Sequence, residues 1–500
     1  MSNHSLASVQ KKAARFWWLP SAEAVIFIIV FWLSVYVMPY LINSDGDLGR
    51  HIIIGEVLLN TREIFQTDIF SHTMFGEKLI LHEWLSDILF AKVYLLYGLN
   101  GIAWITSATL AGTYALFTAG LKFLNIRTPI RFFAGMAAFL VGINHWHTRP
   151  HIITTLLFTY LTLTLIYYYK TEERKALYPI PFVIILWANL HGAFISGLVQ
   201  IALLFIGLCI ERKRTAAGTI GILFIVSVAA SLINPYGAEM ITHSFGYLQL
   251  DFLINLTNEY NSPNFHHAIT WPFLGILLLT IVAGWYRNTK ADWVQLTLLL
   301  FWTASALYSA RNIPLFGQVA VLFLAIQGDQ IAQALSPKLN RFLSVSDYAG
   351  KQAWGWMWSI GFAAFVMFSQ VKGTTFDVLD QGNQFSPDSF PIKAIDELEE
   401  REILTGNVFN EFRWGGYLLY RLWPKHLVFI DGQTDFYGED LTYIHQQTIK
   451  GQGDWQHVLD QYDVNWVILR PSQPLEKLLT VSNDWEKVYT DNTASVFMRK

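Results

Sequence analysis

Two aspartates in one short stretch are the first residues that could do chemistry. Asp45 and Asp47 flank Gly46, directly after an apolar run long enough to cross a bilayer. Two carboxylates joined by a flexible glycine can point at one site, where they could bind a divalent cation or act as general base on an acceptor hydroxyl. The alternative is an ordinary solvated turn that ends the first span, since Asp and Gly favour turns.

Further ionisable residues follow in the same loop, which we place at residues 43–100. They are Arg50, His51, Asp68, His72, His82 and Glu83. Charged groups cost free energy near hydrocarbon, so a cluster of them beside a membrane span is a functional candidate.

Other predicted outer loops carry a second group of candidates. The run NHWHTRPH contains His147 and Arg149, while His191 and Arg311 follow in later loops. Arginine suits phosphate because its planar fork binds two oxygens at once. For any one histidine, a structural hydrogen bond at the interface is the more common role. The functional interpretation therefore depends on several predicted loops on one side of the membrane carrying such residues together.

A third motif lies near the C-terminus, in RWGGY and FIDGQTD. Trp414 and Tyr417 flank Gly415 and Gly416, which would let the backbone approach a ligand closely. We expect Asp431 to end a buried strand, where α/β folds place ligand sites. The alternative is a cap at the end of that strand.

The composition predicts a membrane protein. Charged residues form 15% of the 500 residues, compared with roughly 25% in soluble domains, and the mean hydropathy is +0.33. The net charge of -3 provides no basic surface, so nucleic acid is not an expected partner. The single Cys209 excludes an internal disulfide and any cysteine-based metal site.

We expect about eleven spans, from window length and flanking charge. The first covers about 22–42, and the others are 101–124, 131–146, 151–169, 178–191, 193–210, 217–234, 271–287, 292–310, 313–330 and 354–371. Trp84–Leu99 carries Asp87 and Lys92 and is predicted to be an amphipathic helix in the interface.

The distribution of Lys and Arg predicts the orientation. Loops such as that of Arg212, Lys213 and Arg214 place most of the short-loop positive charges on one side, which we assign to the cytoplasm together with segment 1–21. The first loop and the C-terminal region would then share the opposite face.

Beyond residue 371 the pattern changes to short apolar strands alternating with helices. Strands are predicted at 407–412, 426–432, 464–470 and 494–500, and helices at 392–402, 440–450, 454–462 and 475–481. Residues 372–500 are thus predicted to form a soluble, extracytoplasmic α/β domain. The chain has no Walker loop, GxGxxG, GxSxG or HExxH motif, which disfavours nucleotide-driven transport and serine or zinc hydrolysis.

The motifs SDGDLGRHIIIGEVLLN, HTRPH, WANLHGAF, INPYG and ARNIPLF resemble, in this order, those of bacterial GT-C membrane glycosyltransferases related to protein mannosyltransferases and oligosaccharyltransferases. The tail RWGGYLLYRLWPKHLVFIDGQTDFYG is similar to the tail of that group. It has RWGGY where the oligosaccharyltransferase pattern has an aspartate after the tryptophans, which argues against an Asn-x-Ser/Thr acceptor peptide.

The resemblance implies a GT-C-like domain over 22–371 and a polyprenyl-phosphate sugar donor. Asp45 or Asp47 would be the catalytic base, or the ligands of Mg²⁺ or Mn²⁺ if the reaction needs a metal. Donor phosphate would bind Arg149, His147, His191, Arg311 and His51, and the acceptor would contact Glu83, Trp414, Tyr417 and Asp431.

The function expected on this basis is inverting sugar transfer to a glycan, lipid or protein acceptor, at the outer face of a bacterial inner membrane. A flippase or exporter of lipid-linked saccharides is one alternative, and it would require charged residues midway through the spans. A non-catalytic scaffold with the same fold is the other.

Overall fold

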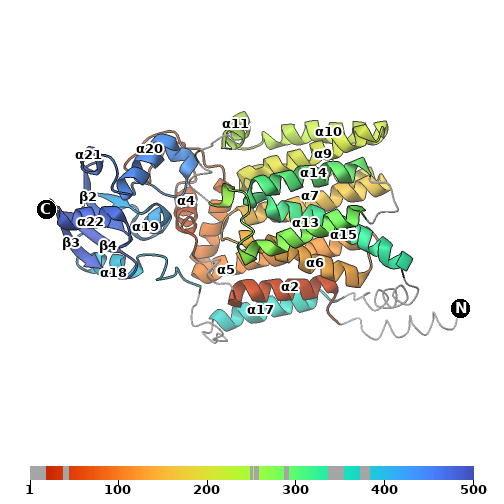
Figure 1. Cartoon of the computed structure of the whole chain (residues 1–500), viewed down its shortest axis with the longest axis horizontal. Coiled ribbons are helices and arrows are strands. Elements are labelled where there is room, and N and C mark those ends of the chain that lie inside the picture. The colour runs from red at the N-terminus through yellow and green to blue at the C-terminus, as the bar shows by residue number, and fades with distance from the viewer. Residues whose placement is uncertain are drawn as a thin grey trace, which may run out of the picture.

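The computed structural model describes residues 19–37, 44–247, 252, 258–285, 292–335, 354–371 and 383–500. A bundle of long helices forms one part, and a C-terminal unit with a small sheet forms the other, with α4 between them (Figure 1). Residues 1–18 of the predicted cytoplasmic segment, and residues 38–42 of the predicted first span, lie outside the described residues.

The first part consists of α-helices that run mostly along the long axis of the molecule (Figure 1). They are α2 (Ala22–Trp32, continued by a π-helical turn at Leu33–Val37), α4 (Leu48–Thr61), α5 (Trp84–Phe123), α6 (Thr128–Gly142), α7 (His151–Thr171), α8 (Ile180–Leu190), α9 (Ile195–Ile210), α10 (Arg214–Ser231), α11 (Ala238–Tyr247), α13 (Trp271–Trp285), α14 (Trp293–Tyr308), α15 (Ile313–Leu335) and α17 (Met357–Val371).

Six helical segments among the described residues are long and apolar enough to cross a membrane, so the chain is a multi-pass membrane protein. They are Trp84–Phe123, His151–Thr171, Gly192–Ile210, Arg214–Ser231, Ala268–Trp285 and Ala310–Gln333. Ala22–Tyr36, Trp293–Tyr308 and Met357–Val371 are apolar but shorter. The helices at the predicted spans 131–146 and 178–191 have only 15 and 11 residues, so the number eleven stays a prediction.

The predicted interfacial helix and the span after it form one long element, α5. Gly98 interrupts this helix with φ 59° and ψ -154°, a conformation outside the helical range. Glycine adopts it without the Cβ clash that other residues would meet. The two predicted segments therefore exist as two helical arms, although the position of the first arm in the membrane interface stays a prediction.

The C-terminal unit contains a four-stranded mixed sheet with the strand order β1-β2-β4-β3. The strands are β1 (Asn407–Asn410), β2 (Val464–Leu469), β3 (Trp485–Thr490) and β4 (Ser495–Arg499), and the helices are α18 (Ile392–Glu400), α19 (Gly415–Leu422), α20 (Thr434–Ile449), α21 (Trp455–Gln461) and α22 (Pro474–Val481). β1 and β2 pair in parallel, whereas β4 pairs antiparallel with both β2 and β3.

The predicted strand at 426–432 is wrong, because this buried segment belongs to no sheet. Val428 forms an isolated bridge with Ser71 of the first loop. The Asn410 side chain accepts a hydrogen bond from Phe429 N and donates one to Ile430 O, both at 2.9 Å. One polar side chain thus supplies the partners that a neighbouring strand would otherwise give.

The first loop and the C-terminal unit share one hydrophobic core. Ile52 and Leu81 from the loop pack in the same buried cluster as Leu419 and Trp466. Thr73 Oγ1 also donates to Phe429 O, and His72 Nε2 lies 2.9 Å from Val408 O. The C-terminal unit is therefore joined to the first loop through side-chain contacts between segments that are far apart in the sequence.

Candidate functional site

The Asp45–Asp47 turn lies where α4 begins, between the bundle and the C-terminal unit. Asp47 is the residue that precedes α4, and its N–H donates to Asp45 Oδ1 at 3.0 Å. The Asp45 side chain is 1% exposed and that of Asp47 13%. A Cβ atom on Gly46 would overlap the carbonyl oxygen of Arg413, so only glycine allows this approach.

Arg149 brings the two aspartates together. It follows α6 and the short helical turn Ile143–His145, and its Nε contacts Asp45 Oδ2. Its Nη1 lies 3.1 Å from Asp47 Oδ2 and 3.8 Å from Glu259 Oε1. Burial by itself raises the pKa of Asp45, but attraction to Arg149 and His147 outweighs it and holds that pKa well below its usual range. Asp45 is therefore a carboxylate at every physiological pH.

Histidines surround this centre. His147 Nδ1 is 3.9 Å from Asp45 Oδ2, and the ring centroids of His145 and His151 are 4.4 Å apart. Burial and neighbouring positive charges hold the pKa of His145 well below its usual value, so this ring is neutral. Of the predicted phosphate ligands, His147 lies beside the Asp45–Arg149 pair.

A second polar cluster is centred on Glu83. His191 Nε2 lies 3.2 Å from Glu83 Oε1, and His51 Nε2 and His82 Nε2 each lie 3.8 Å from Glu83 Oε2. Burial raises the pKa of Glu83 and lowers the pKa of both His51 and His82 to about 4. Two predicted phosphate ligands, His51 and His191, thus contact this carboxylate, and none of the contacts described here joins them to Arg149.

Arg311 lies close enough to both clusters to act on their charges. Its positive charge lowers the pKa of His145, of His191 and of Glu83, although burial is the largest influence on each group. Its guanidinium also contacts the Tyr260 hydroxyl. The structure therefore brings this predicted residue to the same end of the bundle.

Three predicted acceptor contacts are buried in the C-terminal unit instead. Trp414 and Tyr417 are 0% and 1% exposed and belong to the hydrophobic core. Asp431 is 3% exposed, and its carboxylate faces Arg50 Nε at 4.0 Å. Asp431 follows the buried segment around Val428, which belongs to no sheet, so its predicted position at the end of a strand is wrong. None of the three presents a surface to an acceptor.

The glycines of RWGGY serve contact within the protein. A Cβ atom on Gly416 would overlap the Gly46 carbonyl oxygen, and one on Gly49 would overlap that of Gly416. Gly415 packs equally closely on the Ile430 carbonyl oxygen. We predicted a close approach of backbone to a ligand, whereas the close approach is to the turn that carries the aspartates.

Sequence reasoning missed several residues of this region. Glu259 contacts Arg149, and Arg50 donates from Nη1 to Gln433 Oε1 at 2.9 Å. Glu259 precedes the apolar helix α13 in the chain, so its position in a predicted outer loop was a usable signal. Gln433 had none, because its partner is 383 residues away.

The predicted Mg²⁺ or Mn²⁺ site between Asp45 and Asp47 stays a prediction, and Arg149 already contacts Oδ2 of both carboxylates. Asp45 Oδ1 also accepts the Asp47 N–H, and among the described residues no third His, Cys, Asp or Glu completes a ligand group with the two aspartates. A different set offers better donors: His82, His243 and Asp435 each place one potential ligand atom within 4.8 Å of the others. The potential metal site of the described chain is this one.

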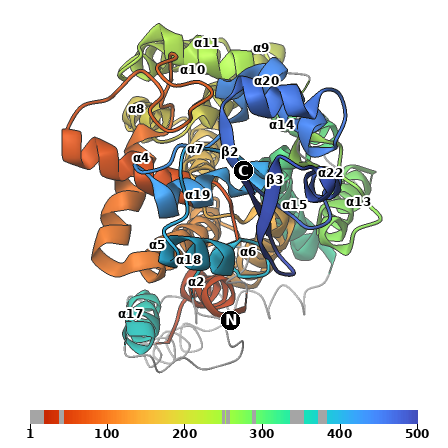
Figure 2. The ribbon, with the colours of Figure 1, turned by 90° about the vertical axis from the view of Figure 1, so that its left-hand side faces the viewer.

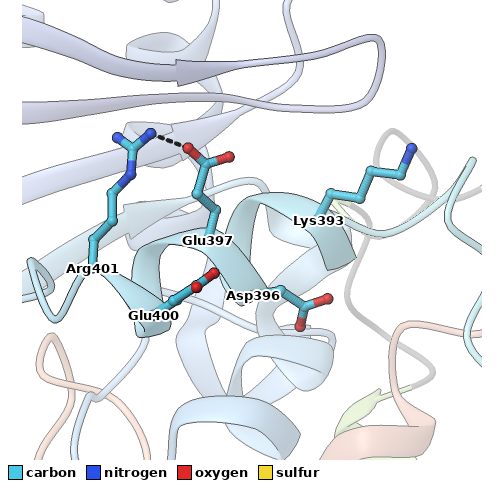
Figure 3. Close-up of a pocket in the computed structure, with 5 residues that line it drawn as sticks. All are labelled: Lys393, Asp396, Glu397, Glu400 and Arg401. Carbon is cyan, nitrogen blue, oxygen red and sulfur yellow. Dashed lines mark hydrogen bonds and ion pairs between the residues drawn. The ribbon is translucent and has the colours of Figure 1, made fainter.

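A hollow of about 660 Å³ on α18 is unrelated to these clusters (Figure 3). It is lined by Lys393, Asp396, Glu397, Glu400 and Arg401. Glu397 and Arg401 pair with each other along the helix, and their side chains are 38% and 50% exposed. Solvated charges from one helix define no binding site.

The fold is that of known membrane glycosyltransferases. The Archaeoglobus fulgidus oligosaccharyltransferase in its apo form matches with a TM-score of 0.54 and 10% identity, over 93% of this chain and 69% of the other. The Archaeoglobus fulgidus oligosaccharyltransferase AglB, in complex with an inhibitory peptide and a dolichol-phosphate, matches with a TM-score of 0.55 and 10% identity, over 96% and 74%. No protein-family profile and no curated protein matches the sequence. The resemblance to the GT-C superfamily that the sequence motifs predicted is thus confirmed for the fold.

Proposed function

We propose that this protein is a membrane glycosyltransferase that moves a sugar from a polyprenyl-phosphate donor to an acceptor. The proposal rests on one observation: Arg149 contacts both Asp45 and Asp47 between the bundle and the C-terminal unit. The chain that holds them has the fold of an oligosaccharyltransferase solved with a dolichol-phosphate. The charge distribution of the loops supports a site on the outer face of a bacterial inner membrane.

Arg149 is the proposed donor phosphate ligand. Its side chain is 33% exposed, so the guanidinium reaches solvent while it contacts the carboxylates. The neighbouring His147 ring is 35% exposed and can add a hydrogen bond to the same phosphate. Positive charge at this point would stabilise the lipid phosphate as it leaves the sugar.

Asp47 is the proposed general base. Asp45 is almost fully buried, and its bond to Arg149 makes it a weak proton acceptor, which suits it to hold Arg149 in place. Asp47 is more exposed and can reach an acceptor hydroxyl. It would take the hydroxyl proton while the oxygen attacks the sugar C1 and the C1–phosphate bond breaks, which inverts the anomeric centre.

A non-catalytic scaffold is the second candidate, because the same Arg149 contacts could be purely structural. A flippase has less support, because it would require charged residues midway through the spans. The buried ion pair of Asp329 on α15 with Arg127 lies instead beside the start of α6, at the opposite end of that helix from the site. Its two partners pair with each other, so this pair offers no unpaired charge to a sugar phosphate.

The test is retention of donor by the purified protein, measured by native mass spectrometry with polyprenyl-phosphate sugars. We expect one bound lipid donor in the wild type, loss with Arg149→Ala, and no loss with Arg174→Ala, a control at the exposed start of a short 3-10 helix. Transfer to a hydroxyl acceptor should then be lost in Asp47→Asn. A wild type that retains no donor would favour the scaffold, and unchanged transfer by Asp47→Asn would refute the proposed base.

A further inference from the structure

Three potential metal ligands come together from three distant parts of the chain. His82 lies in the first loop, two residues before α5 begins, His243 lies on α11, and Asp435 lies in the first turn of α20. α11 belongs to the helical bundle and α20 to the C-terminal unit, and both lie on the same side of the molecule (Figure 2). The cluster therefore bridges the two parts.

Two of the three distances between the ligand atoms match those of a tetrahedral zinc site, and all three atoms lie within 4.8 Å of one another. His243 Nε2 is 3.3 Å from His82 Nδ1 and 3.3 Å from Asp435 Oδ2. With metal–ligand distances of about 2.0–2.1 Å, tetrahedral ligand atoms lie roughly 3.3–3.4 Å apart. The side chains of His82 and His243 are 18% and 20% exposed, so an ion and one water molecule can reach the cluster.

Hydrogen bonds alone do not satisfy this arrangement. His243 Nε2 carries at most one hydrogen, yet it faces both a ring nitrogen and a carboxylate oxygen. The Asp435 side chain is 7% exposed, and its buried Oδ2 atom accepts no hydrogen bond of acceptable geometry. A buried carboxylate oxygen without a hydrogen bond is costly, and a cation bound to all three atoms would remove that cost.

The second nitrogen of His82 points away from the cluster. Nε2 faces Glu83 Oε2 at 3.8 Å, and Glu83 contacts His191 in turn. Metal-binding histidines typically direct their other ring N–H to a carboxylate, which orients the ring. Glu83 stands in that position.

We propose that His82 Nδ1, His243 Nε2 and Asp435 Oδ2 bind one divalent transition-metal ion, with Zn²⁺ the best match to two imidazoles and a carboxylate. The ion joins the C-terminal unit to α11 and the first loop. Its role is to hold the unit over the Asp45–Arg149 centre. This site is separate from the sugar-transfer residues, and its test does not depend on the proposed function.

The first experiment titrates Co²⁺ into the metal-free full-length protein in detergent and follows visible absorption. We expect one equivalent with the strong bands of a four-coordinate site, displaced by Zn²⁺. Asp435→Asn and His243→Gln should weaken binding by more than the roughly 10- to 100-fold that loss of an outer-shell partner costs. Asp440→Asn, exposed on the same helix, and the exposed His457→Gln are the matched controls and should bind like the wild type.

Equal affinity in the wild type and the two ligand variants would overturn the proposal. So would a folded wild type that shows no such bands. If a ligand variant fails to fold, X-ray absorption at the zinc edge of the wild type decides the question. Two imidazoles and oxygen are expected there, and a spectrum without imidazole would refute the site.

Discussion

The peptide of Gly416 lies directly against that of Gly46, so closely that a Cβ atom on Gly416 would overlap the Gly46 carbonyl oxygen. The C-terminal unit thus holds the turn that carries both aspartates. Gly416→Ala should push this turn away, weaken donor retention and lower the thermal unfolding temperature. Steric overlap in a packed region typically costs about 1–3 kcal/mol.

Gly275→Ala in α13 is the control for that change, because apart from its chain neighbours and the backbone of its own helix no protein atom lies within 4 Å of its Cβ position. It should leave donor retention and unfolding temperature unchanged or slightly raise the latter, since Ala favours helices. Equal behaviour of the two variants would show that the glycine contact does not position the site.

The Asp45–Arg149 pair should appear as a coupling energy in unfolding. Arg149→Ala leaves the buried Asp45 without its partner, and Asp45→Asn removes one carboxylate that Arg149 contacts, so the double variant should lose less stability than the two single losses together. Arg149 is one third exposed and screened by solvent, so we expect a coupling of about 1–2 kcal/mol. Chemical denaturation of all four proteins in detergent measures it, and additive losses would contradict the pairing.

Asp431 should make stability depend on pH. Burial raises its pKa to about 6, against the opposing attraction of Arg50, while an unfolded aspartate titrates near 3.9. The folded protein therefore holds this proton more tightly, and stability falls as the pH rises from about 4 to 6. The full change is about 3 kcal/mol. Asp431→Asn should lack this slope, so its stability relative to the wild type should rise between pH 4 and pH 6.5.

A buried ion pair at the far end of the bundle should matter for stability and not for donor binding. Arg127 Nε donates to Asp329 Oδ1 at 2.7 Å, and the side chains are 9% and 7% exposed. Removing one partner by Asp329→Ala should cost about 3–5 kcal/mol. The exposed pair of Glu397 and Arg401 is the matched control, and Glu397→Ala should cost less than about 1 kcal/mol.

The sequence alone determined that this is a multi-pass membrane protein, because long apolar helices follow directly from local composition. It also determined where the polar residues of the loops lie along the chain. Asp45, Asp47 and Arg149 could be identified as candidates because charged side chains beside a membrane span cost free energy, whatever the tertiary structure.

Only the tertiary structure decided which of these residues meet. Arg149 contacts both aspartates, although it lies about a hundred residues away in the chain. Trp414 and Tyr417 are core residues. The sequence could not show this, because an aromatic residue can face either a ligand or the protein interior. The pairing of His82 with His243 and Asp435 left no local signal either. Contacts between distant segments depend on how whole helices pack, and a local pattern carries no information about that.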